Sequence, residues 1–346
     1  MRARNIARLR ILVGVTLASA ALGAALSWRD PAVRLIGNAV ASGLTGAVLA
    51  VFEIALQGPA RAPLQQLPVT FVLLLRVIVY GVVLAATPEL VAMAARRLAP
   101  SPALEDTLGT GLGNAIIVAI AFNTFFVARA LMGPSTLLAF LSGRYHRPRR
   151  EERLVLFLDL HGSTALAERL GDLGFHRFLN RLTLDLTDPI VDAKGEIYRY
   201  VGDEIIVSWR IERGDEGSLA LASLRTIDEM LIARRDAYLA EFGEVPRLRG
   251  GLHAGSLVIG EMGQLKRELV MLGDTMNTTA RIVEACRQTG RDYIASAAAL
   301  RLAGPLQNMR AEPLGPMPLR GKEEPVELFA LLRDAPAAET SASAAA

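Results

Sequence analysis

The sequence predicts an α+β protein, in which an apolar helical part precedes a domain of mixed strands and helices. Hydrophobic residues make up 51% of the 346 residues and the mean hydropathy is +0.32, values too apolar for two ordinary soluble domains. The apolar excess lies before about residue 133. Beyond that point, short apolar runs rich in β-branched residues alternate with longer segments of helical composition, which favours an α+β domain.

Four N-terminal stretches are apolar and long enough to cross a bilayer as helices. They cover residues 9–28, 35–56, 69–95 and 108–132. The first has a basic start and an Ala-Ser-Ala sequence, as cleaved signal peptides do, but the three further spans favour its retention as a helix. We therefore expect a membrane domain of four helices over residues 1–133.

Arginines flank this membrane domain on both sides. A basic run at 144–153 follows the last span, and four arginines precede the first. These four are Arg2, Arg4, Arg8 and Arg10. Because positive residues stay on the cytoplasmic side, both ends are expected there. The sequence thus predicts a multi-pass protein of the cell (inner or plasma) membrane with a cytoplasmic C-terminal domain.

Two ionisable residues, Glu53 and Arg76, fall within successive predicted spans. Charge in a bilayer is expensive, so such residues usually pair or line a polar cavity. The pair could be structural, or Glu53 could lie near enough to a helix end to be solvated. Alternatively, the two could form an ion pair that senses or transmits a signal.

A basic linker over residues 134–152 joins the membrane domain to the rest. Leu137, Leu138 and Leu141 have the spacing of a short amphipathic helix. We expect this segment to transmit signals between the two domains. Its arginines could equally rest on anionic lipid headgroups.

The C-terminal half, residues 153–332, has the predicted order β-α-β-β-α-β. This order is that of the ferredoxin-like split arrangement. The elements expected are a strand at 154–160, a helix at 165–187, a hairpin around Asp203, a helix at 218–242 and a strand at 248–254. The tail at 333–346 is rich in Ala and Ser and is expected to be disordered.

Two aspartates close strand-like segments of this domain. Asp159 ends an apolar run typical of a buried strand, and Asp203 follows Gly202 in the turn of the predicted hairpin. Magnesium is commonly held by one or two carboxylates together with substrate phosphates and water. The pair therefore suits a two-metal phosphoryl-transfer site, although a single Asp at a strand end is more often a solvated turn residue.

A third segment adds two polar residues on one helical face. If a helix begins near Thr275, Asn277 and Arg281 lie four residues apart and share a side. Together an amide and a guanidinium could bind a polyphosphate where negative charge develops in a transition state. Otherwise they are simply exposed helix residues.

Four segments in this order resemble the catalytic domain of the class III nucleotidyl cyclases, the adenylate and guanylate cyclase family. The segments are residues 157–164, 200–204, 273–281 and 319–322. The resemblance extends over about residues 153–332. It implies a ferredoxin-like cyclase domain that forms cyclic nucleotides for intracellular signalling.

The resemblance also implies roles for individual residues. Asp159, Asp203 and the backbone carbonyl of Leu160 would hold two Mg²⁺ or Mn²⁺ ions. Asn277 would orient the ribose, and Arg281 would stabilise charge on the α-phosphate as pyrophosphate leaves. In this family the last two residues come from the partner subunit, so we expect a homodimer with composite sites.

Substrate phosphates have two expected binding regions. The resemblance matches Lys322 to a phosphate-binding lysine, although Arg320 could serve instead. Independently, Gly162, Ser163 and Thr164 lead into a predicted helix, whose free N–H groups attract phosphate. Thr164 is a plausible N-cap there, whereas the resemblance gives the neighbouring His161 no catalytic role, so we expect a solvent-exposed loop histidine.

The predicted base pocket departs from the family pattern. Many members carry Lys where this chain has Arg199, and Asp or Thr where it has Val270. Arg199 can donate to adenine, whereas neither side chain accepts the N1 and N2 protons of guanine. These residues favour ATP over GTP, and hence an adenylate cyclase.

Other classes of function are less well supported. A guanylate cyclase, a catalytically silent cyclase-like receptor and a transport role for the spans remain alternatives. One cysteine and four histidines give no zinc spacing. The net charge of +3 is mostly explained by the arginines beside the membrane, so we expect lipid rather than nucleic acid as a partner.

Overall fold

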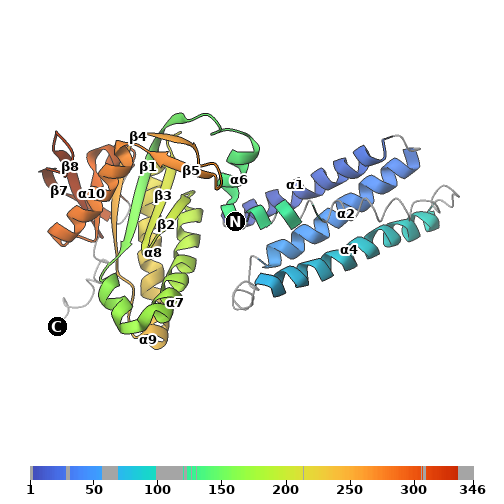
Figure 1. The fold of residues 1–346 in the computed structure, drawn as a ribbon, viewed down its shortest axis with the longest axis horizontal. Helices are drawn as coiled ribbons and strands as arrows, with labels where there is room; N and C mark the ends of the chain where they lie inside the picture. Colours follow the sequence, from blue (N-terminus) through green and yellow to red (C-terminus); the bar gives the residue numbers. More distant parts are fainter. Residues whose placement is uncertain are drawn as a thin grey trace, which may run out of the picture. The chain divides into compact units, whose positions relative to one another are not determined.

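A computed structural model describes residues 3–28, 32–56, 69–98, 120, 123–125, 127–129, 131–212, 214–304, 306 and 309–333. The chain divides into two compact units, Met1–Leu138 and Ala139–Ala346 (Figure 1). The division falls inside the linker expected at 134–152, where the short helix α6 (Pro134–Leu141) forms. The tail expected from residue 334 onward lies outside the described residues.

The first unit contains three long apolar helices, shown in blue to cyan in Figure 1. They are α1 (Ala3–Leu26), α2 (Ala32–Leu56) and α4 (Val69–Leu98). Each holds a segment long and apolar enough to cross a membrane, at Leu9–Leu26, Leu35–Leu56 and Leu74–Val91. The fourth predicted span, at 108–132, lies mostly outside the described residues, so the described part contains three such helices.

Small residues bring α1 and α2 into close contact. A Cβ added to Gly23 would lie 2.3 Å from Ser42 Oγ, and one added to Gly46 would lie 2.3 Å from Ser19 Oγ. Close approach of this kind is common between helices in membranes. It makes α1 and α2 one tightly packed pair.

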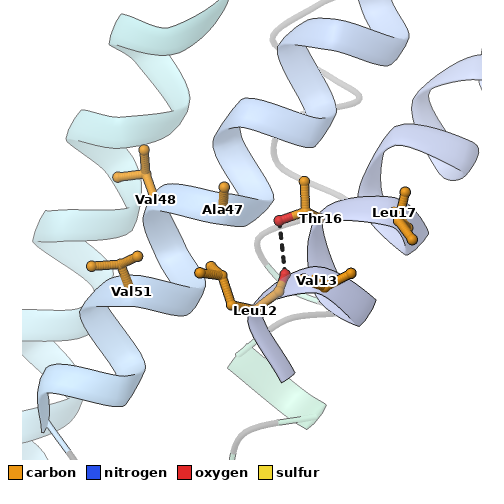
Figure 2. Close-up of a pocket in the computed structure, with 7 residues that line it drawn as sticks. All are labelled: Leu12, Val13, Thr16, Leu17, Ala47, Val48 and Val51. Carbon is orange, nitrogen blue, oxygen red and sulfur yellow. Dashed lines mark hydrogen bonds between the residues drawn. The ribbon is translucent and has the colours of Figure 1, made fainter. Parts of the chain in front are cut away.

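An apolar pocket lies where α1 and α2 meet (Figure 2). It is lined by Leu12, Val13, Thr16, Leu17, Ala47, Val48 and Val51. The only side-chain hydroxyl among them, on Thr16, donates to the carbonyl of Leu12 at 2.8 Å. The lining therefore suits hydrocarbon and offers nothing to a nucleotide.

Glu53 joins α2 to α4 through a buried polar cluster. Its side chain is fully buried and accepts hydrogen bonds from Arg76 Nη2 at 3.0 Å and from Tyr80 Oη at 2.8 Å. A buried carboxylate requires such partners. The structure thus contains the predicted Glu53–Arg76 pair and adds Tyr80, which favours the structural interpretation.

The second unit is built on one mixed sheet, with strand order β2-β3-β1-β4-β6-β8-β7 and β5 paired to β4. Its first four strands in the chain are β1 (Arg149–Leu160), β2 (Glu196–Val201), β3 (Glu204–Arg210) and β4 (Leu248–Met262). All neighbours among these four are antiparallel. This order confirms the predicted ferredoxin-like arrangement, although β1 begins earlier and β4 ends later than expected.

Four further strands extend the sheet beyond that arrangement. They are β5 (Glu268–Leu272), β6 (Tyr293–Ser296), β7 (Met309–Met317) and β8 (Val326–Arg333). β6 runs parallel to β4, and β8 pairs antiparallel with both β6 and β7. The short helix α11 (Ala297–Leu300) follows β6.

Helices cover both faces of this sheet. They are α7 (Ser163–Asp192), α8 (Glu216–Ala233), α9 (Arg235–Phe242) and α10 (Asp274–Thr289), and the helix predicted at 218–242 is interrupted at Arg234. Leu156 and Leu158 of β1 pack in the core formed with α7 and α8, whereas Val155 and Phe157 pack on the side of α10. Because side chains alternate along a strand, Asp159 faces the side of α10.

Candidate active site

Asp159 lies near the end of β1 and is almost completely buried, with 4% of its surface exposed. Its Oδ2 accepts a hydrogen bond from Arg287 Nη2 at 2.6 Å, and Arg249 Nε lies 3.3 Å from the same oxygen. Arg249 is the register partner of Asp159 on β4. Two cations therefore balance this carboxylate.

Asp203 and Glu204 add two carboxylates at the adjacent hairpin. Gly202 has a positive φ of 62°, which allows the tight turn between β2 and β3 where Asp203 lies. Burial, together with the negative charges of Asp159 and Asp203, raises the pKa of Glu204 to about 7, against the opposing effect of Arg287. These three residues form what we term the carboxylate cluster.

The carboxylate cluster suits magnesium or manganese. Its donors are hard oxygen atoms, and the pKa of Glu204 is raised first by burial and then by the negative charges of Asp159 and Asp203. Among the described residues, no group of three or more His, Cys, Asp or Glu side chains has the arrangement of a complete metal cage. Two aspartates with open positions for water and phosphate are sufficient for Mg²⁺.

The start of α7 follows Asp159 closely in the chain. The helix begins at Ser163 after Gly162, which has a positive φ of 69°, and no side chain caps it. Thr164 is therefore not the N-cap that the sequence suggested, because the helix begins one residue before it. The uncapped N–H groups of the first turn remain available to water or phosphate.

Asn277 and Arg281 lie on the side of α10 opposite its buried face. The buried residues of α10 are Thr275, Thr278, Thr279, Ile282, Val283, Ala285 and Cys286. Asn277 is exposed, and Arg281, 38% exposed, pairs with Glu284 at 3.0 Å. Within the described part of the chain, no hydrogen bond or ion pair joins either residue to Asp159 or Asp203.

Lys322 lies beside the start of α10. It forms an ion pair with Asp274, the first residue of that helix. Lys322 thus belongs to the same region as Asn277 and Arg281, while the alternative phosphate ligand, Arg320, is exposed. One chain therefore carries two separate groups of site residues, the carboxylate cluster and the donors around α10.

The predicted base-pocket residues lie on β2 and β5. Arg199 donates to Glu268 at 2.6 Å, and its guanidinium lies 5.3 Å from the ring centroid of Tyr198. Val270 is partly buried two positions after Glu268, on the same face of β5. The Tyr198 hydroxyl, which accepts from the backbone N–H of Met271 at 2.9 Å, holds the two strands together.

Four charged residues of this region are not among the site residues predicted from the sequence. They are Glu204, Arg249, Glu268 and Arg287. Glu204 and Glu268 could have been found because one follows a proposed metal ligand and the other shares a strand face with Val270. Arg249 and Arg287 depend on strand register and helix packing, which no local pattern reveals.

Known proteins share this domain. Residues 146–332 match the model of the "Adenylate and Guanylate cyclase catalytic domain" family. "Adenylate cyclase 2" of Rhizobium meliloti (strain 1021) is 37% identical over 222 residues, which cover 63% of this chain and 61% of that protein. "Adenylate cyclase" of Anabaena cylindrica is 27% identical over 154 residues, covering 42% and 30%. The matched regions thus span less than two thirds of either relative.

A solved structure has the same fold. The structure of a bacterial light-regulated adenylyl cyclase aligns with a TM-score of 0.55 at 20% identity and covers 63% of each chain. At this identity the similarity concerns the fold alone. It agrees with the ferredoxin-like arrangement of β1 to β4.

Proposed function

Because this chain belongs to the adenylate and guanylate cyclase family, we propose that it is a membrane-bound adenylate cyclase. It converts ATP to 3′,5′-cyclic AMP and pyrophosphate for intracellular signalling. The observation that supports this proposal best is the division of site residues into two groups, the carboxylate cluster and the donors around α10. Each group supplies half of what cyclisation of a nucleoside triphosphate requires.

The carboxylate cluster is the metal-binding half. Asp159, Asp203 and the carbonyl of Leu160 hold two Mg²⁺ or Mn²⁺ ions. The chemistry that the ions supply is activation of the ribose 3′-hydroxyl and neutralisation of charge on the triphosphate. Arg249, whose Nε lies 3.3 Å from Asp159 Oδ2, balances part of the negative charge of this half.

The donors around α10 are the half that binds substrate. Asn277 orients the ribose, Arg281 stabilises charge on the α-phosphate, and Lys322 binds the outer phosphates. Gly162, Ser163 and Thr164 add backbone N–H groups at the start of α7. Because Asn277 and Arg281 lie away from the sheet of their own chain, a homodimer brings them to the carboxylate cluster of the partner.

The residues of the base pocket determine whether ATP or GTP is the substrate. Arg199 donates to N1 of adenine, and the relatives named above are adenylate cyclases. A guanylate cyclase is the second candidate, because Glu268 beside Arg199 supplies an acceptor for the N1 and N2 protons of guanine. Val270 contributes no hydrogen bond to either base.

Three helices that are long and apolar enough to cross a membrane support a location in the cell membrane. We assign a multi-pass topology with the catalytic unit in the cytoplasm, supported by the arginines that flank the apolar segments. ATP and the lipid bilayer are then its partners, together with a second copy of the chain.

The test uses the full chain in detergent with ATP or GTP and Mg²⁺ or Mn²⁺. We expect cyclic AMP from the wild type, and a loss of more than about a hundredfold in kcat for Asp203→Ala, because metal coordination contributes several kcal/mol. Asp172→Ala, which changes an exposed aspartate of α7, is the matched control. Faster turnover of GTP supports the guanylate cyclase, and nucleotide binding without turnover supports a silent regulator.

A further inference from the structure

The last turn of α10 is fixed against the sheet beside Asp159. A Cβ added to Gly251 of β4 would lie 2.9 Å from the carbonyl oxygen of Thr279, so the helix approaches the strand closely. Further along, the buried Cys286 donates from Sγ to the carbonyl of Gly250 at 3.5 Å. These contacts leave little freedom in the position of the next residue, Arg287.

Arg287 extends from this turn into the carboxylate cluster. Its side chain is 58% exposed, yet its guanidinium lies 2.6 Å from Asp159. It also interacts favourably with Asp203, and it lowers the pKa of Glu204 against the effects that raise it. One guanidinium thus balances the charge of all three carboxylates.

A divalent cation that binds Asp159 and Asp203 requires the same oxygen atoms and the same negative potential. Asp159 has only 6% of its side chain exposed, so cations can reach it from few directions. Arg249, 12% exposed, already occupies one of them at 3.3 Å. A metal ion and the Arg287 guanidinium would repel each other at this distance.

We propose that Arg287 is the resident cation of the metal site, which neutralises Asp159 in the nucleotide-free protein and which a divalent ion must displace. This inference rests on the proposed function, because it assumes that the metal binds at Asp159 and Asp203. The triphosphate of a bound nucleotide offers the displaced guanidinium another anion. Metal binding and nucleotide binding are therefore coupled through Arg287, and free metal binds weakly.

The test measures Mn²⁺ binding to the full chain in detergent, without nucleotide, from the electron paramagnetic resonance signal of unbound Mn²⁺. We expect Arg287→Gln to bind Mn²⁺ at least about tenfold more tightly than the wild type, because a competing charge is removed. Arg291→Gln is the matched control, since Arg291 pairs at 3.0 Å with Glu312 outside the carboxylate cluster. It should leave the affinity unchanged.

Asp203→Ala distinguishes a failure of the proposed role of Arg287 from a failure of the metal site itself. If Asp203→Ala loses Mn²⁺ binding while Arg287→Gln binds as the wild type does or more weakly, the role of Arg287 is refuted and the metal site stands. If neither the wild type nor Arg287→Gln binds Mn²⁺, the metal site is refuted, and the proposed function that depends on it is refuted as well. Tighter binding by Arg287→Gln that Asp203→Ala abolishes in the double variant supports both.

Discussion

His253 shows how a single residue can make the stability of the catalytic unit depend on pH. Its Nδ1 lies 2.8 Å from Ser296 Oγ. That oxygen accepts a hydrogen bond from the backbone N–H of Ala299 at 3.2 Å, so its own proton is free to go to His253. The Ser296 hydroxyl can then donate to Nδ1 in the neutral imidazole, the form that burial favours. Burial, with a smaller contribution from Lys322, lowers the pKa of His253 to about 4, and Asp274 opposes this effect.

The stability of the protein should therefore fall as the pH drops from 7.5 to 5. The pKa of His253 is lower in the folded chain than the value of about 6.5 expected in the unfolded chain, so the unfolded state takes up the proton first. At pH 5 this lowers the free energy of unfolding by roughly 2 kcal/mol. His253→Asn cannot titrate and should lose less stability on acidification.

Thermal unfolding of both proteins in detergent, followed by circular dichroism at each pH, measures this difference. His176→Asn, at an exposed histidine of α7, should keep the acid sensitivity of the wild type. Identical pH dependence of unfolding in the wild type and His253→Asn would show that His253 does not cause the acid sensitivity.

At the residue scale, local sequence predicts the carboxylates better than their partners. An apolar run that ends in Asp159, and a glycine turn that holds Asp203, are local signals. The Arg249 partner depends on the β1–β4 register, and the Arg287 partner depends on where α10 crosses β4. Such long-range contacts are absent from any local pattern, which explains why the sequence analysis missed both arginines.

Among the elements, β4 and α10 form the contact that positions most of the site. Gly251 makes this contact possible, since a Cβ there would lie 2.9 Å from both the Thr279 carbonyl oxygen and the Val283 backbone nitrogen. Backbone atoms of a helix cannot move independently. A larger residue therefore displaces α10 as a whole.

Gly251→Ala should destabilise the catalytic unit by about 1–3 kcal/mol, the usual effect of overpacking. It should also reduce activity, since α10 carries Asn277 and Arg281. Gly304→Ala is the matched control, because its added Cβ would meet only the Ser218 hydroxyl at 3.3 Å. Unfolding midpoints in urea report the change, and equal midpoints for the two variants would contradict the proposed role of this contact.

The element order of the catalytic unit was predictable because each strand and helix has its own local period. The exact ends of these elements, and the interruptions within them, were not predictable from local sequence. The helix predicted at 218–242 is interrupted at Arg234, whose side chain instead pairs with the buried Asp185 of α7. Strand β1 extends back into the basic run at Arg149, because it pairs there with β4 as far as Ile259. Contacts between elements distant in the sequence therefore set both the end of α8 and the start of β1.

Within the first unit, the Glu53–Arg76 pair should hold α2 against α4. Removing one charge of a buried pair leaves the other without a partner, so Glu53→Gln should destabilise this unit by about 3 kcal/mol. The double variant Glu53→Gln with Arg76→Met should recover part of that loss. Thermal unfolding in detergent measures both, with Glu89→Gln, at an exposed position of α4, as the control.

A sensing role for Glu53 and Arg76 makes a different prediction. In that case Glu53→Gln would change cyclase output without changing unfolding. A variant of normal stability and altered output would therefore favour signalling over structure.

For the whole molecule, the decisive property is that one chain holds two incomplete half-sites. Asp159 faces α10 of its own chain, yet only Arg287 of that helix reaches it, while Asn277 and Arg281 face away. In the homodimer that we propose, two-fold symmetry pairs each carboxylate cluster with the partner's donors. It therefore contains two composite sites.

Mixing two inactive variants tests this arrangement directly. Asp159→Ala removes one half-site and Asn277→Ala removes the other, so homodimers of either variant should be nearly inactive. In an equal mixture that exchanges subunits freely, about half of the dimers are mixed, and each mixed dimer keeps one intact site. Activity should then return to roughly a quarter of the wild-type value, by the symmetry of the assembly. A mixture of Asp159→Ala with Asp203→Ala should recover nothing, because both changes fall on the same half-site. No recovery in the first mixture, despite proven subunit exchange, would show that each chain completes its own site, and recovery in the second would show that Asp159 and Asp203 act from different chains.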